Sequence, residues 1–155
     1  MTKILFVCLG NICRSPMAEF LFNDMVKKRG LSDRLSAASA ATSYEEVGNP
    51  VHHGTRQKLA AQGISVAGKH AVRMSAGDYD KYDWIIGMER SNIAGIMRII
   101  GSDPQSKVSL LLSFAGRNDD IADPYYTGDF DATYADVYEG CSALLDYLTA
   151  RENLK

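Results

Sequence analysis

The feature that most constrains this chain is a strand of buried type that runs directly into a short loop and then a helix. The run from Ile4 to Val7 is apolar without alternation, which is typical of a central parallel strand covered on both faces. Ser15 is a favourable N-cap residue and Pro16 suits the first helical position, so a helix should begin there. The loop should therefore span residues 8–15, where the helix N-terminus directs free N–H groups and favours anion binding.

The residues of this loop suit attack on an oxyanion. Cys8 and Arg14 are separated by five residues, and Gly10 permits close approach of the backbone to a ligand. The helix dipole and Arg14 both favour the thiolate of Cys8, which predicts a nucleophile near neutral pH. The planar guanidinium of Arg14 can bind two phosphate oxygens at once. The plain alternative is a buried cysteine and an unrelated surface arginine, and the strand–loop–helix context argues against it.

Candidate strands and helices alternate along the rest of the chain. The candidate strands are residues 35–42, 81–88 and 107–112, and the candidate helices are residues 16–29, 52–62, 91–100 and 137–148. This alternation predicts a doubly wound α/β domain, with a parallel sheet of about four strands, helices on both faces and flavodoxin-like strand order. Ligands bind such sheets at the carboxyl ends of the strands, and the Cys8 loop lies at such an end.

Composition limits the class of protein. The 155 residues are 46% hydrophobic, which suffices for one core and predicts a single domain over residues 1–155. The net charge of −2 gives no electrostatic basis for nucleic acid or an anionic membrane as the main partner. The apolar run Ile4–Leu9 is too short for a signal peptide or a membrane span, and an odd set of three cysteines suits a reducing compartment. We therefore expect a cytoplasmic protein, and a monomer.

The segment Val7–Pro16 resembles the phosphate-binding loop of the low-molecular-weight protein tyrosine phosphatases. The similarity continues through Ser39–Ser43, Gly48–Pro50 and Asp123–Tyr126, so it covers essentially the whole chain. The resemblance implies hydrolysis of phosphotyrosine in proteins, and of small aryl phosphates, through a cysteinyl-phosphate and without a cofactor. Phosphate-like oxyanions are then the expected inhibitors.

Each residue type fits the chemistry that this resemblance implies. Cys8 would attack phosphorus, Arg14 and the loop amides would bind the oxygens, and Asp123 would serve first as acid and then as base. Ser15 is expected to donate a hydrogen bond to the Cys8 sulfur and to ease its departure in the second step. The residues expected to contact the substrate are Leu9, Gly10, Asn11, Ile12, Cys13, Glu45, Tyr125 and Tyr126.

Two Asp-Pro pairs compete for the acid role. Asp103 follows closely on Gly101 at the end of a candidate helix, where Asp-Pro is ordinary turn chemistry. Asp123 lies in a longer irregular segment before the last helix, beside two tyrosines that could flank an aromatic ligand. Position and resemblance both favour Asp123 as the acid and assign Asp103 to structure.

Histidines in this chain admit several interpretations. Residues 63–70 match a nucleotide-binding P-loop except at His70, but the preceding segment reads as a helix, so we expect an ordinary loop. The pair His52 and His53 lacks the spacing of a metal site, and no metal is expected. By resemblance, His70 would support the phosphate loop through Asn11. From the residues alone, an exposed histidine in a loop fits nearly as well.

One departure from the family pattern lies between Ser39–Ser43 and Gly48–Pro50. Many phosphatases of this type carry an aromatic wall of the substrate cleft there, whereas the equal-length position of this chain is Glu45, preceded by Tyr44. Either Tyr44 turns in as a substitute, or Glu45 leaves the cleft more open and disfavours acidic peptides. We favour the opened cleft.

Two other functions compete with hydrolysis. A thiol-coupled arsenate reductase could use the same loop, but it needs further cysteines to resolve the arsenylated thiol, and only Cys13 is close in sequence. Cys141 falls on the apolar stripe of the last helix and reads as core. A silent phosphate-binding module would be expected to have lost Cys8 or Asp123, and both are present.

Overall fold

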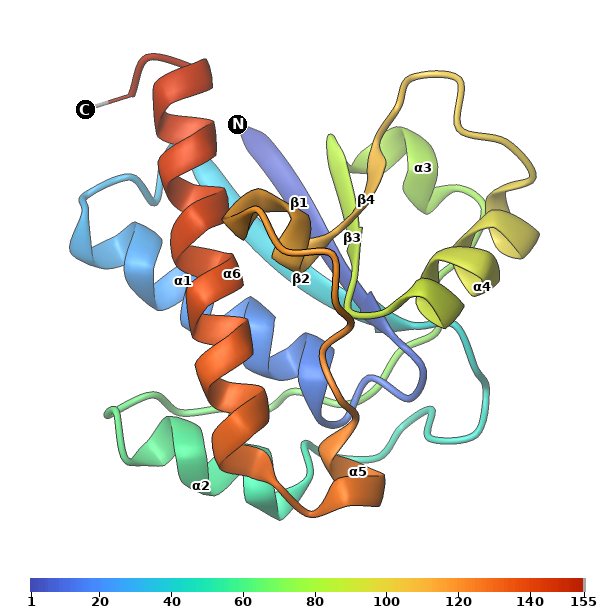
Figure 1. Cartoon of the computed structure of the whole chain (residues 1–155), viewed down its shortest axis with the longest axis vertical. Helices are drawn as coiled ribbons and strands as arrows, with labels where there is room; N and C mark the ends of the chain where they lie inside the picture. The colour runs from blue at the N-terminus through green and yellow to red at the C-terminus, as the bar shows by residue number, and fades with distance from the viewer. Residues whose placement is uncertain (155) are drawn as a thin grey trace.

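Four parallel strands in the order β2-β1-β3-β4 form the centre of the protein in a computed structural model that describes residues 1–154 (Figure 1). The strands are β1 Thr2–Cys8, β2 Leu35–Ala41, β3 Trp84–Gly87 and β4 Val108–Leu110. The helices are α1 Arg14–Lys28, α2 His53–Ala60, α3 Asp78–Lys81, α4 Arg90–Ile100, the 3-10 helix η1 Leu111–Ala115, α5 Pro124–Thr127 and α6 Phe130–Arg151.

The strand order confirms the predicted doubly wound sheet with flavodoxin-like order. β1 pairs with β2 on one side, from Thr2 opposite Leu35, and with β3 on the other side, from Ile4 opposite Trp84. The chain therefore leaves β1 toward β2 and later crosses back to the far side of β1. This reversal opens a crevice at the carboxyl ends of β1 and β3, the place where such sheets bind ligands.

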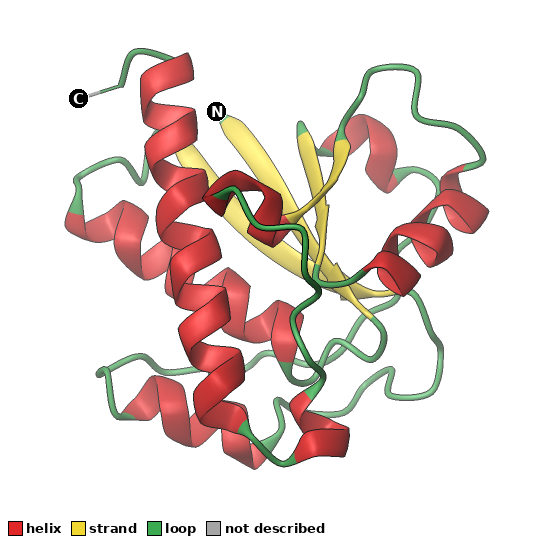
Figure 2. Ribbon diagram, in the orientation of Figure 1, coloured by secondary structure: helices red, strands yellow, loops and turns green. Residues whose placement is uncertain are grey.

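The two faces of β1 explain its unbroken apolar run. Ile4 and Phe6 lie in the core beneath α1 and α6, whereas Leu5 and Val7 pack with the opposite face beneath α3 and α4. Figure 2 shows the two groups of helices on either side of the sheet. Each of these four side chains is at most 2% exposed, and full burial of such a residue contributes about 1.5–3 kcal/mol. The strand is thereby fixed, and with it the position of the loop that follows.

Some expected element boundaries are wrong. α1 begins at Arg14, after Cys13, which supplies no side-chain cap, so Ser15 is not the N-cap. The reason is that the Ser15 hydroxyl turns toward the sulfur of Cys8, as described below. α2 is shorter than residues 52–62, with His52 as its N-cap through Nδ1. The short helices α3 and α5 and the η1 turn were not predicted, because four or five residues carry too little periodicity.

The long helix α6 closes the face that carries α1. Its buried residues are Thr133, Val137, Gly140, Cys141, Leu144, Leu145 and Leu148. Cys141 is fully buried, which confirms its assignment to the core, and its burial raises the pKa of the thiol. Within residues 1–154, no helix combines the length and the apolar character that crossing a membrane requires.

A glycine in α6 allows the close contact of this helix with η1. A Cβ added at Gly140 would lie 2.5 Å from Cγ of Leu111. We expect Gly140→Ala to lower the free energy of unfolding, because overpacking costs about 1–3 kcal/mol and outweighs the helix propensity gain of about 1 kcal/mol. Urea unfolding measures the change. In a Leu111→Ala background the same substitution should become neutral or stabilising, and a stabilising effect in the unmodified protein would contradict this packing.

Candidate active site

The sulfur of Cys8 lies at the carboxyl end of β1, where it receives hydrogen bonds from the loop. Cys8 is 3% exposed, and its Sγ lies 3.3 Å from the donating backbone N–H of Asn11 and 3.0 Å from Oγ of Ser15. Both the Asn11 N–H and the Ser15 hydroxyl are groups that can donate a hydrogen bond to this sulfur. The structure thus brings together the predicted nucleophile and the predicted hydroxyl partner.

Asn11 holds the loop in its curled conformation. Its φ is 60°, in the left-handed region that Asn tolerates better than most residues. The side-chain Nδ2 donates to Oγ of Ser15 at 2.8 Å and to Oγ of Ser39 at 2.9 Å, while Oδ1 accepts from the backbone N–H of Val72 at 3.1 Å. This buried side chain therefore connects the loop to β2 and to the segment before α3.

The predicted support by His70 is wrong. His70 is exposed, and its Nδ1 lies 3.2 Å from the carbonyl of Gly68 rather than near Asn11. The neighbouring Lys69 points inward instead: its Nζ donates to the carbonyl of Ser39 at 3.1 Å and lies 3.4 Å from Oε1 of Glu19. Adjacent residues of an extended segment point to opposite sides, so the inward position of Lys69 leaves His70 facing outward.

Arg14 is buried with its charge balanced by two carboxylates. The residue is 2% exposed; Nη1 donates to Oε2 of Glu89 at 2.6 Å and to the carbonyl of Ile121 at 2.9 Å. Nη2 lies 3.3 Å from Oδ2 of Asp123. A buried guanidinium is stable only with such partners, and these partners fix the plane in which it can meet a phosphate.

Glu89 is a partner of Arg14 that the sequence analysis did not indicate. It is the N-cap of α4 and forms a capping box with Asn92, directly after β3. Burial would raise the pKa of Glu89, but hydrogen bonds from Ser91 and Arg14 and the charge of Arg14 outweigh burial and lower it. The sequence did offer one indication of Glu89, because it follows β3. The carboxyl ends of β3 and β1 meet at one edge of the sheet, where the Cys8 loop lies.

Asp123 is placed by the helix that follows it. Its Oδ1 accepts from the backbone N–H of Tyr125 at 3.1 Å, which makes it the N-cap of α5, with Pro124 as the first helical residue. Its side chain is 19% exposed. Asp103, by contrast, accepts from the Tyr79 hydroxyl and from two backbone N–H groups, so its assignment to structure is confirmed.

A cavity of about 130 Å³ joins these groups. It is lined by Cys8, Leu9, Gly10, Asn11, Ile12, Cys13, Arg14, Ser43, Glu45, Glu46, Asp123, Tyr125 and Tyr126. Of the residues expected at the site, Ser15 lies behind the loop and His70 lies elsewhere. Ser43 and Glu46 also line the cavity, although the sequence analysis did not name them as site residues. The cavity thus places a sulfur, a guanidinium, loop amides and a carboxyl around one small space.

The mouth of the cavity has an aromatic and an acidic wall. Tyr125 and Tyr126 are 54% and 74% exposed, with ring centroids 5.2 Å apart. Glu45 lines the cavity, whereas Tyr44 does not and is 72% exposed. The ring of Tyr44 instead carries the guanidinium of Arg73 at 4.1 Å from its centroid. Of the two arrangements left open by the sequence, the structure has Glu45 at the cleft.

The second cysteine of the loop remains a thiol. Burial raises the pKa of Cys13 to about 12, and the negative charge of Asp123 adds to the rise. Cys13 therefore does not compete as a nucleophile at neutral pH. Among residues 1–154, no three His, Cys, Asp or Glu side chains are grouped to hold a metal ion.

Comparison with known proteins gives the same assignment. A family model described as low molecular weight phosphotyrosine protein phosphatase matches residues 3–154. The chain belongs to this family. The sequence-based prediction of a phosphatase of this family is therefore confirmed, and the chain is an enzyme of this class.

Individual relatives match this chain along nearly their whole length. The low molecular weight protein-tyrosine-phosphatase YfkJ of Bacillus subtilis is 40% identical over 99% of this chain and 100% of its own. Its crystal structure matches with a TM-score of 0.94 over 97% of this chain and 96% of that one. The phosphatase SP-PTP of Streptococcus pyogenes matches with a TM-score of 0.87 and 38% identity, over 99% and 97% of the two chains. The structure of a Drosophila protein described as an arginine phosphatase matches with a TM-score of 0.86 and 34% identity, over 95% of this chain and 98% of that one.

The ion pair of Arg14 with Glu89 leads to a stability prediction for this phosphatase. Glu89→Gln should lower the free energy of unfolding by about 1–3 kcal/mol, because the buried guanidinium loses a charged acceptor. Phosphate should then raise the thermal midpoint more in this variant than in the wild type, since the bound anion compensates Arg14 and no longer meets the charge of Glu89.

Asp103→Asn is the matched control. It also removes the charge of a hydrogen-bonded carboxylate, but Asp103 does not line the cavity. It should lower stability without enlarging the response to phosphate. An equal phosphate response in the wild type and both variants would contradict the assigned role of Glu89.

Proposed function

We propose that this enzyme hydrolyses phosphotyrosine in proteins, and small aryl phosphates, through a phosphoryl group carried on Cys8. The observation that supports this most is the convergence of Cys8, Arg14 and Asp123 on one cavity of about 130 Å³. The two exposed tyrosines at its mouth, Tyr125 and Tyr126, suit an aromatic substrate.

The first step transfers the phosphoryl group to sulfur. The Cys8 thiolate attacks phosphorus, the S–P bond forms, and the bond from phosphorus to the phenolic oxygen breaks. The loop amides and Arg14 bind the other oxygens, in positions that need little rearrangement as charge develops. To act as the acid, Asp123 must carry a proton when the substrate is bound, and it gives this proton to the departing phenolate.

The second step frees the sulfur. The Asp123 carboxylate removes a proton from a water molecule, which attacks the phosphorus; the S–P bond breaks and inorganic phosphate leaves. The leaving group is now the Cys8 thiolate, which Ser15 Oγ at 3.0 Å can stabilise with a hydrogen bond. The product is an oxyanion that fits the same site, so phosphate and its analogues should inhibit competitively.

Phosphoarginine is a second candidate substrate. The similar Drosophila structure is described as an arginine phosphatase, and the carboxylates of Glu45 and Glu46 line the cavity, where they would suit a cationic substrate. The tyrosine wall favours an aromatic ring instead. Direct comparison of kcat/KM for a phosphotyrosine and a phosphoarginine peptide decides between them, and we expect the former to be higher.

We also propose that the enzyme works as a cytoplasmic monomer. The chemistry depends on a free thiolate, which a reducing compartment preserves. All three cysteines, Cys8, Cys13 and Cys141, are free in the structure.

The nucleophile is tested with Cys8→Ser. Hydrolysis of an aryl phosphate in the presence of EDTA should be lost, while binding of phosphate or vanadate is largely retained, because Arg14 and the loop amides remain. Activity of Cys8→Ser near that of the wild type would overturn the role of Cys8. Circular dichroism shows whether the variant is folded.

The acid is tested through the leaving group. Asp123→Asn should lower kcat/KM, which reports the first step, by about 10²–10⁴-fold for phenyl phosphate and far less for an activated nitrophenyl phosphate, since only the poorer leaving group needs a proton. Asp103→Asn is the control and should leave both rates close to those of the wild type. An equal loss of kcat/KM for the two substrates in Asp123→Asn would remove Asp123 from the role of acid.

A further inference from the structure

We infer that a second hollow, beside the catalytic cavity, binds an anionic side chain of the substrate: a carboxylate or a second phosphate near the phosphotyrosine. This inference rests on the proposed function. The hollow has a volume of about 660 Å³, and its polar lining comes from Thr42, Ser43, Arg73, Ser75 and Arg98. We call it the arginine hollow.

The arginine hollow continues from the catalytic cavity. Leu9 and Ser43 line both spaces, and the backbone N–H of Ser43 donates to the carbonyl of Leu9 at 3.0 Å. The two residues therefore lie on the boundary that the two spaces share, where Leu9 is 41% exposed. A peptide whose phosphotyrosine occupies the cavity can extend across this boundary into the hollow.

Arg73 is oriented but not neutralised. Its Nε donates to the carbonyl of Thr42 at 3.2 Å and Nη1 to the carbonyl of Met74 at 3.4 Å, while the ring of Tyr44 covers one face. Within residues 1–154, it forms no ion pair with a carboxylate. A guanidinium held in this way keeps its charge for an added anion, with little loss of side-chain freedom on binding.

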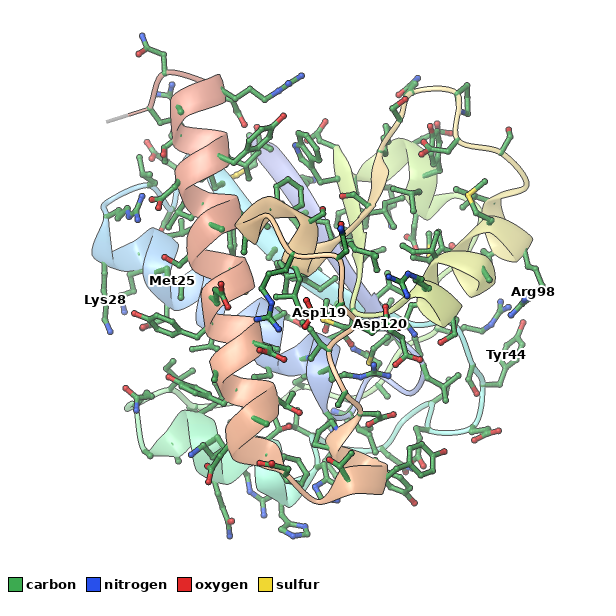
Figure 3. The ribbon with its side chains drawn as sticks, in the orientation of Figure 1. Met25, Lys28, Tyr44, Arg98, Asp119 and Asp120 are labelled. Atoms are coloured by element: carbon green, nitrogen blue, oxygen red, sulfur yellow. The ribbon has the colours of Figure 1, made fainter. Side chains whose placement is uncertain are left out.

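Arg98 adds a second positive charge. It lies exposed in the last turn of α4, and Figure 3 shows it with Tyr44 at one edge of the molecule, away from α6. Its side chain has no ion pair with any carboxylate of the described residues 1–154. A cation at a helix C-terminus is favourable in itself, so the two arginines together, rather than Arg98 alone, support the inference.

The carboxylates near the site lie on other walls. Glu45 and Glu46 line the catalytic cavity and not the arginine hollow. Asp78 is held on the backbone N–H of Ser75 at the start of α3 and does not line the hollow either. The cleft is therefore polarised, with negative charge on one wall and positive charge beyond Ser43. A substrate with acidic residues on only one side of its phosphotyrosine matches this arrangement.

Four phosphotyrosine peptides test the inference. One has neutral flanks, one has acidic residues before the phosphotyrosine, one has them after it, and the fourth carries a phosphoserine on the side that the enzyme prefers. A small aryl phosphate, which is too short to reach the hollow, reports on the chemistry alone. We expect the wild type to give a higher kcat/KM for one acidic peptide than for the neutral peptide.

The variants are Arg73→Gln, Arg98→Gln and the double substitution. Each should lower kcat/KM for the preferred peptide by about two- to fivefold, mainly through KM, the range that an exposed charge pair contributes. The loss should shrink at high salt, and the aryl phosphate should be unaffected. Arg34→Gln is the matched control, since Arg34 is an exposed arginine next to the amino end of β2. It should leave kcat/KM unchanged for every substrate.

Glu45→Gln separates the two walls. It should raise kcat/KM only for the peptide whose acidic residues lie on the side away from the arginine hollow. The reason is that it removes the repulsion between those residues and the Glu45 carboxylate at the catalytic cavity. A larger preference for the phosphoserine peptide than for the acidic peptide would identify a second phosphate as the favoured group, and an equal preference would show that a carboxylate suffices.

The inference fails if the wild type has the same kcat/KM for the acidic peptides as for the neutral one. It also fails if both arginine variants lower kcat/KM equally for all substrates. If Arg73→Gln perturbs folding, Arg98→Gln alone decides. A wild type that hydrolyses neither an aryl phosphate nor any phosphotyrosine peptide would instead refute the proposed function.

Discussion

The buried guanidinium of Arg14 is the interaction on which the rest of the site depends. It sits at the first residue of α1 and contacts Glu89 after β3, the carbonyl of Ile121 and Asp123 before α5. These partners come from two separate parts of the chain, Glu89 in one and Ile121 and Asp123 in the other. Since an unpaired buried charge is strongly destabilising, folding brings those segments together and thereby assembles the acid, the arginine and the loop.

A second set of contacts holds the loop against its own strain. Asn11 has a left-handed backbone conformation. Its side-chain nitrogen donates hydrogen bonds to Ser15 and Ser39, and its side-chain oxygen accepts one from the N–H of Val72. Ser39 in turn donates to Glu19 at 2.6 Å, beside Lys69. The N–H groups of the loop are thus kept for a ligand, because side chains of the sheet and of α1 support the loop from behind.

The sequence predicted those features that local pattern determines. The apolar strand, the loop between Cys8 and Arg14 and the alternation of elements follow from neighbouring residues, and the family resemblance identified Asp123. Glu89, by contrast, acts through a contact 75 residues away in the chain, which no local pattern indicates. The directions in which Lys69 and His70 point are set by the contacts of the folded chain, which the sequence does not show, so the predicted support of the loop by His70 was wrong.

The central claim is that the phosphoryl group passes through the sulfur of Cys8, and trapping that intermediate tests it most directly. In Asp123→Asn, an activated aryl phosphate should still phosphorylate the enzyme, whereas hydrolysis of the intermediate lacks its base. Rapid acid quenching followed by peptide mass spectrometry should then find one phosphoryl group on the peptide that contains Cys8. Steady turnover with the phosphoryl group on another residue, or with none on the enzyme at any time, would contradict the account.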